Sequence, residues 1–166
     1  GTAFVGAGDG STIGEIDFLG TQTLGGSGDI LFGGHGANNL YVYFNDTTVT
    51  LGPGLTVHGA RGYLSAAIPS RSLVNRGTIA ADVPGGAIDV VGAGPFSNSG
   101  TLAAVGGTLA IYPASWSSTG VLSATSGGTL TLTNSGINSG PITANGGTVN
   151  LDGAWSNSAV PTLAGG

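Results

Sequence analysis

Large apolar residues alternate with smaller or polar ones in four short segments of the second half of the chain. Each segment follows a pair of glycines and places large apolar side chains at its second and fourth positions; the segments are 87–90, 108–111, 129–132 and 148–151. A period of two places successive side chains on opposite faces of a β-strand. We therefore predict four strands, each with one face turned to the core and one turned to solvent.

A five-residue motif that ends in glycine recurs at a constant interval between these strands. It reads Phe96-Ser-Asn-Ser-Gly100, then Trp116-Ser-Ser-Thr-Gly120, then Gly136-Ile-Asn-Ser-Gly140. Each unit contains a corner, a strand, a Gly-Gly turn and a second strand. We expect the glycine and asparagine residues of the corners to supply the left-handed backbone conformations that sharp bends need.

A strand of three or four residues buries little surface alone, but stacked copies of it form a continuous core. A repeat of this length suits one coil of a solenoid, in which equivalent positions lie about 4.8 Å apart and pair through backbone hydrogen bonds. The predicted fold is all-β: a right-handed parallel β-helix, or β-solenoid, with coils of about 20 residues. A bundle of antiparallel hairpins is the alternative, which explains the short strands but not the near-constant period.

The whole chain of 166 residues is predicted to form one β-solenoid domain. Residues 1–72 are expected to form irregular N-terminal coils, because their strand-like segments recur without a clear period. Residues 73–166 carry the regular repeats, and the last repeat ends in mid-pattern. We therefore expect the domain to be part of a longer chain or of an assembly.

The composition narrows the range of functions. The chain has 34 Gly, only 3 Lys and Arg together, 8 Asp and Glu together, and no Cys. Three cations cannot neutralise a run of phosphates, so nucleic acid is not an expected partner. No apolar run reaches the roughly 18 residues of a membrane-spanning helix, so no membrane span is expected. Without Cys there is no disulfide framework and no cysteine-based zinc site.

Several segments together resemble the repeat tracts of large bacterial surface proteins. The segments are 48–51, 55–59 and 73–80, followed by the repeated Gly-Gly-Thr-Leu. In this order they are similar to the repeats of autotransporter and filamentous-haemagglutinin-like adhesins, which have right-handed parallel β-helix passengers. The resemblance implies a secreted protein with a structural role, located outside the cell or at the cell surface. It supplies no catalytic residues.

The acidic residues do not form an obvious catalytic group. They are Asp9, Glu15, Asp17, Asp29, Asp46, Asp82, Asp89 and Asp152. A carbohydrate-cleaving β-helix needs clustered carboxylates on one face, yet only Asp82 and Asp89 share a coil of the regular repeats. With no Cys and no His-x-x-x-His spacing, His35 and His58 do not indicate zinc. We therefore expect no catalytic residues, no cofactor and no enzymatic activity.

Calcium is the one metal that the sequence suggests. The segment 33–41 fits the nonapeptide Gly-Gly-x-Gly-x-Asp/Asn-x-Leu-x of calcium-binding β-rolls, and the segment 25–29 is one residue too short for it. The candidate ligands are Asp29, Asn38 and Asn39. A β-roll site takes ligands from successive turns, and this pattern does not repeat in register. The alternative is a glycine-rich bend with no metal.

Aromatic residues and one sequon are the remaining candidate features. Phe96, Trp116 and Trp155 occupy the same corner position, where they form either a strip that stacks on glycans or a ladder that covers the core. We favour the ladder. Asn45 begins the sequon Asn45-Asp-Thr47, which makes it a candidate for N-glycosylation.

The predicted function is structural. We expect a non-enzymatic extracellular protein, a β-solenoid building block of a filament or a surface stalk, whose main partner is itself in a head-to-tail homo-oligomer or filament. The alternative is a glycan-binding adhesin module of a bacterial surface protein, with surface glycans as its partners and with Tyr112, Trp116 and Trp155 on the binding flank.

Overall fold

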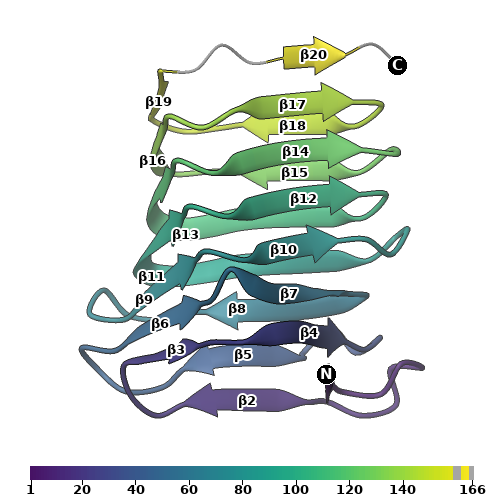
Figure 1. Cartoon of the computed structure of the whole chain (residues 1–166), viewed down its shortest axis with the longest axis vertical. Helices are drawn as coiled ribbons and strands as arrows, with labels where there is room; N and C mark the ends of the chain where they lie inside the picture. The colour runs from purple at the N-terminus through teal and green to yellow at the C-terminus, as the bar shows by residue number, and fades with distance from the viewer. Residues whose placement is uncertain (159–161, 165–166) are drawn as a thin grey trace.

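Each turn of the chain adds one strand to each of three rows, and the turns stack along the long axis of the molecule (Figure 1). The structure is a computed structural model that describes residues 1–158 and 162–164. Within these residues every regular element is a β-strand, and all pairings between these strands are parallel. The predicted all-β solenoid is therefore confirmed, and the antiparallel hairpin bundle is wrong.

The first row is a sheet of eight strands in sequential order. Its strands are β1 (Thr2–Val5), β4 (Ser27–Phe32), β7 (Gly54–Gly59), β10 (Thr78–Ala81), β12 (Thr101–Val105), β14 (Val121–Thr125), β17 (Ile142–Asn145) and β20 (Thr162–Ala164).

The other two rows are joined into one sheet of twelve strands, because β11 (Ala87–Asn98) and β13 (Thr108–Ser118) run through both rows. The second row also contains β2 (Glu15–Phe18), β5 (Asn39–Val42), β8 (Arg61–Ser65), β15 (Thr129–Leu132) and β18 (Thr148–Leu151). The third row also contains β3 (Gln22–Leu24), β6 (Thr48–Leu51), β9 (Ser72–Asn75), β16 (Ser135–Asn138) and β19 (Trp155–Asn157).

Coil length changes along the axis. Register places Val121 next to Thr101, which confirms the predicted coil length in the regular part of the chain. Nearer the N-terminus, Thr2, Asp29 and Thr56 are successive neighbours in the first row, so the coils there are longer. The longer coils have longer connections between strands, whereas the strands themselves keep their stacking.

The core is a set of aliphatic columns inside the coils. Ile79, Leu102, Leu122 and Ile142 are neighbours in successive strands of the first row, and each is at most 2% exposed. A second column in the second row contains Ile88, Leu109 and Leu130, all fully buried. Burial of one such side chain contributes about 1.5–3 kcal/mol, so stacking supplies the stability that an isolated short strand lacks.

A column of polar side chains lies inside the corner that leads from the third row to the first. Asn75 Nδ2 donates to Asn98 Oδ1 at 2.8 Å, and Asn98 Nδ2 donates to Ser118 Oγ at 3.0 Å. Further along the axis, Asn138 Nδ2 donates to Asn157 Oδ1 at 2.8 Å. These amides also bond the carbonyls of the corner glycines two residues later, as Asn138 does with Gly140 at 2.7 Å. The buried polar groups thereby connect neighbouring coils.

The prediction that the corner glycines and asparagines adopt left-handed backbone conformations is wrong. Gly100, Gly120 and Gly140 do not have positive φ, and neither do the corner asparagines. Instead, a Cβ atom on Gly120 would overlap the carbonyl oxygen of Gly100, and one on Gly140 would overlap that of Gly120. Close approach of the coils excludes a side chain here. Positive φ occurs instead at the first glycine of the pairs that precede β11, β13, β15 and β18, for example 84° at Gly106.

Gly120→Ala is expected to lower the free energy of unfolding by ~1–3 kcal/mol, because the added methyl group would force two coils apart. Urea unfolding followed by circular dichroism of the β-sheet measures the change. Gly36→Ala is the matched control, since a Cβ atom there meets nothing within 4 Å. Equal stability of the two variants would contradict the need for close approach at this corner.

Candidate functional site

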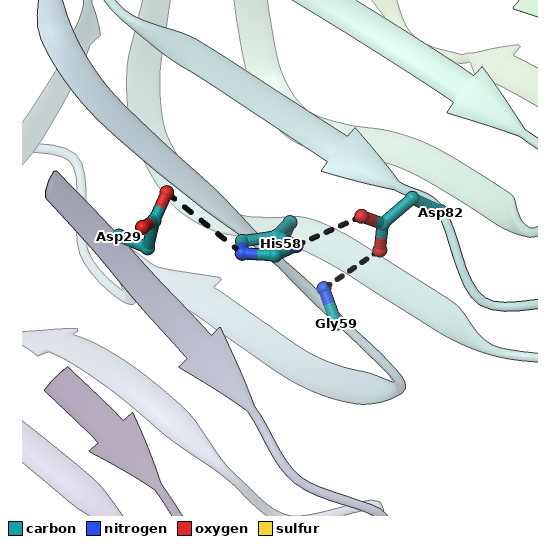
Figure 2. A network of polar contacts seen from close by, with 4 residues as sticks. All are labelled: Asp29, His58, Gly59 and Asp82. Carbon is teal, nitrogen blue, oxygen red and sulfur yellow. Dashed lines mark hydrogen bonds and ion pairs between the residues drawn. The ribbon is translucent and has the colours of Figure 1, made fainter. Parts of the chain in front are cut away.

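Three ionisable side chains from successive coils meet on the outer face of the first row (Figure 2). Asp29 belongs to β4, His58 to β7, and Asp82 directly follows β10. Parallel register pairs His58 with Ala80 in the next strand, which brings Asp82 beside the imidazole. Residues that are far apart in sequence thus become neighbours because the coils stack.

The His58 imidazole lies close to the carboxylate of Asp82 and farther from that of Asp29. His58 Nδ1 and Asp82 Oδ2 are 2.8 Å apart, and the Gly59 N–H donates to Asp82 Oδ1 at 3.1 Å. His58 Nε2 lies 4.0 Å from Asp29 Oδ1. An ionised carboxylate only accepts, so Asp82 fixes the imidazole proton on Nδ1. We call Asp29, His58 and Asp82 the polar clasp.

The polar clasp joins three coils from the outside. Its side chains remain partly exposed, at 25% for His58, 37% for Asp82 and 46% for Asp29. An imidazole oriented by a carboxylate is also the arrangement found in general-base catalysis. A nucleophile of that kind would bond Nε2, yet in the part of the chain that the structure describes no hydroxyl does so. The two hydrogen bonds of Asp82 to His58 and Gly59 make the polar clasp a link between coils.

A second titratable group lies in a small hollow on the second row. Asp89 belongs to β11 and is stacked between Tyr63 and Ala110. The hollow has a volume of about 130 Å³, and Arg61 and Tyr63 are among its lining residues. Burial raises the pKa of Asp89, because the carboxylate loses part of its contact with water. The Arg61 guanidinium donates instead to the Gly85 carbonyl at 3.2 Å.

The candidate calcium ligands lie on different elements and have other partners. Asn38 is fully buried; its Oδ1 accepts from the Gly14 N–H, and its Nδ2 donates to the carbonyls of Gly33 and Arg61. Asn38 therefore connects three coils from inside a corner.

The other two candidate calcium ligands, Asn39 and Asp29, lie in different rows and also have other partners. Asn39 begins β5 in the second row, where its Nδ2 donates to Glu15 and its Oδ1 accepts from Ser65. Asp29 belongs to the polar clasp on the first row. Among the described residues no three His, Cys, Asp or Glu side chains form a group that could hold a metal ion. Calcium at Asp29, Asn38 and Asn39 stays a prediction.

The corner aromatic residues cover the core. Phe96 and Trp116 are stacked neighbours that are only 2% and 5% exposed, and Trp116 Nε1 donates to the Thr133 carbonyl at 2.8 Å. Trp155 is half-buried against the core. The favoured ladder is confirmed, and Trp116 offers no face to a glycan. Gly136 follows Trp116 in the column, because a Cβ atom there would overlap the indole ring.

The sequon residue Asn45 lies on an exposed connection after β5. Its Oδ1 accepts a long hydrogen bond of 3.5 Å from Arg71 Nη2. Glycosylation of Asn45 stays a prediction.

The polar clasp and the hollow at Asp89 were not predicted from the sequence. The sequence indicated no role for His58, because its partners depend on the lengths of two coils in the irregular region. The spacing between His58 and Asp82 is a usable signal only once the register is known.

No protein-family model matches the chain, and no curated protein and no solved structure is found to match it. The fold itself defines the class of the molecule, which is a parallel β-solenoid. In its described part no helix is long and apolar enough to cross a membrane.

Asp82→Ala is expected to lower the free energy of unfolding by about 1 kcal/mol, because it removes two hydrogen bonds between coils from a partly exposed site. Thermal and urea unfolding measure the effect. Asp17→Ala, at an exposed position, is the control. A loss no larger than that of the control would show that the polar clasp does not stabilise the fold.

Asp89→Asn tests the effect of burial on the carboxylate. Because the native state holds the proton of Asp89 more tightly than the unfolded state, its contribution is most favourable at low pH and is lost as the pH rises through the raised pKa. The variant should therefore be more stable than the wild type at neutral pH, by up to ~0.5 kcal/mol. The difference should vanish near pH ~3, where the carboxyl group is protonated. Thermal unfolding from acid to neutral pH measures it, and a constant difference would contradict the expectation.

Proposed function

We propose that the chain is a non-enzymatic, extracellular structural protein, a β-solenoid building block of a filament or a surface stalk. Its units associate head to tail. The resemblance of its repeats to those of autotransporter and filamentous-haemagglutinin-like surface proteins supports the secreted location. The fold supports the structural role, because most strands lie between two others and have their backbone groups paired.

The observation that carries the proposal is that terminal strands of the described structure pair with a neighbour on one side only. At one end of the described structure β1, β2 and β3 each pair on one side only, with β4, β5 and β6. Free strand edges present N–H and C=O groups that bind another strand.

The N-terminal end also has an apolar cavity. A cavity of about 440 Å³ opens there, and Ile16, Leu24, Ile30 and Leu55 are among its lining residues. The last coil of a second copy would cover this apolar surface and continue each row in parallel. Such a contact joins two different surfaces and does not close, so its repetition produces a fibre. A net charge of only −5 opposes this association weakly.

Glycan binding is the second candidate function. It is favoured by large aromatic side chains that remain exposed away from the strand edges, including Tyr43, Phe44 and Tyr112. Aromatic rings with one free face stack on the apolar faces of sugars. This function does not compete with assembly through the ends of the solenoid.

Phe4→Pro is expected to prevent assembly without unfolding the protein. The carbonyls of Gly1 and Val5 accept hydrogen bonds from β4 and the residue after it, so the backbone N–H of Phe4, at an even position, points to the free edge. Proline removes this donor. Phe4→Ala is the matched control, since it removes the same exposed ring and keeps the N–H. Electron microscopy and sedimentation velocity should show fibres for the wild type and the control and dispersed rods for Phe4→Pro.

Dispersed rods for all three proteins would contradict assembly through this edge. Equal fibres for all three would show that assembly uses another surface. The same images recorded with a chelator test the calcium prediction, because fibres that need calcium at Asp29, Asn38 and Asn39 would dissociate.

A further inference from the structure

Two neighbouring coils have enlarged corners between the second and third rows. Counted between the same two columns of stacked residues, the chain takes eight steps from Tyr41 to Val49 and eight from Ser65 to Leu73. In the regular part of the solenoid it takes four steps, from Tyr112 to Trp116. We call the connections 43–47 and 66–71 the corner loops.

The corner loops project together from one side of the molecule. They lead into β6 and β9, at the left of the view in Figure 1. The Asp46 N–H donates to Ser70 Oγ at 3.3 Å, which links the first loop to the second. In solenoids, insertions into successive repeats gather on one face and often form the binding surface. The corner loops are therefore the place where this chain departs from its repeat and presents new side chains.

The first corner loop and the strand before it present a group of aromatic rings. Tyr41 and Tyr43 pack edge to face with ring centroids 5.8 Å apart, and Tyr43 and Phe44 do so at 5.3 Å. Tyr43 is 46% exposed and Phe44 is 51% exposed. Their mutual packing limits the motion of the rings, while each keeps surface free for a ligand.

The second corner loop supplies a guanidinium group beside these rings. Arg71 lies over the Tyr41 ring, 5.5 Å from its centroid, and Nη1 donates to the Tyr41 hydroxyl at 2.9 Å. Its Nε is buried and has no hydrogen-bond partner. Within the described residues no carboxylate lies within 4.0 Å of the guanidinium. A partly buried cation without a carboxylate is costly, and an anionic ligand would compensate it.

The surrounding charges indicate what kind of anion fits. Asp17 is stacked next to Tyr41, and Asp46 lies in the first corner loop, so two carboxylates belong to the same part of the surface as the cation. These carboxylates disfavour an anion that has no hydrogen-bond donors of its own, such as the phosphate group of a nucleic acid. A sugar acid is not excluded in this way, because its hydroxyl groups donate to Asp17 and Asp46 while its carboxylate pairs with Arg71.

We propose that Arg71, Tyr43 and Phe44 form a binding site for an acidic saccharide of the uronate class. The sugar ring stacks on the exposed aromatic rings, and its carboxylate accepts hydrogen bonds from the outer N–H groups of Arg71. The site lies on the side of the solenoid and leaves the strand edges free. It gives the second candidate function a location and a ligand class, and it is independent of head-to-tail assembly.

Binding of a galacturonate trisaccharide, compared with the neutral galactose trisaccharide, tests this site by isothermal titration calorimetry. The wild type should bind the acidic sugar at least ~10-fold more tightly than the neutral one. Arg71→Gln should remove this preference, and Tyr43→Ala should weaken binding of both sugars about tenfold. Arg71→Lys keeps the charge without the planar group, so a partial loss is expected.

Arg61→Gln is the matched control, because Arg61 is the first residue of β8 and lies outside the corner loops. Melting temperature and circular dichroism establish that each variant is folded, and fibre formation on the same samples is a separate readout. Absence of binding in the wild type, or an acidic preference that Arg71→Gln retains, would overturn the proposal. Loss of binding with fibres intact would support it and separate the site from assembly.

Discussion

The distance between neighbouring coils is the constraint on which the rest of the molecule depends. Backbone hydrogen bonds hold successive strands about 4.8 Å apart. The residue at each position must therefore pack against the equivalent residue of the next coil at this distance. Aliphatic residues meet this condition as columns in the core, such as Ile79 with Leu102 and Leu122. At the corner the carbonyl of one coil occupies the place where a Cβ atom of the next would lie, and glycine is the residue that fits.

Polar residues follow the same rule when they are buried. The asparagine column satisfies its amides by donating along the axis, from Asn75 to Asn98 and from there to Ser118. The column has a beginning: Leu51 is stacked before Asn75 and offers no donor, and Asn75 Oδ1 is buried without a partner. A buried acceptor in this state costs about 1–3 kcal/mol. A further polar side chain at this corner is thus favourable wherever the neighbouring coil already has one, because the two can hydrogen-bond. This explains why the motif recurs through the regular repeats.

The repeat in the sequence predicts which residues stack in the regular coils. It does not predict which residues become neighbours in the irregular N-terminal coils. The near-constant period of the motif and the alternation within each strand were enough to predict the fold, the inward columns and the covered position of Trp116. The reason for glycine at the corners was not accessible, because it is a distance between coils and not a backbone angle. The polar clasp and the corner loops depend on the longer N-terminal coils, whose register cannot be counted from the motif.

Segments that depart from the repeat are therefore under different physical constraints from the regular coils. A regular coil is constrained by the coils on both sides, so its residues report on stability. The enlarged corners beside β6 and β9 are free of that constraint on their outer side, where Tyr43, Phe44 and Arg71 are held by each other and by Tyr41. In the described structure β1, β2 and β3 also pair on one side only, so their outer edges are not constrained by a neighbouring coil. Recognition of other molecules is expected at these two kinds of position, because both present groups that can bind a partner from outside.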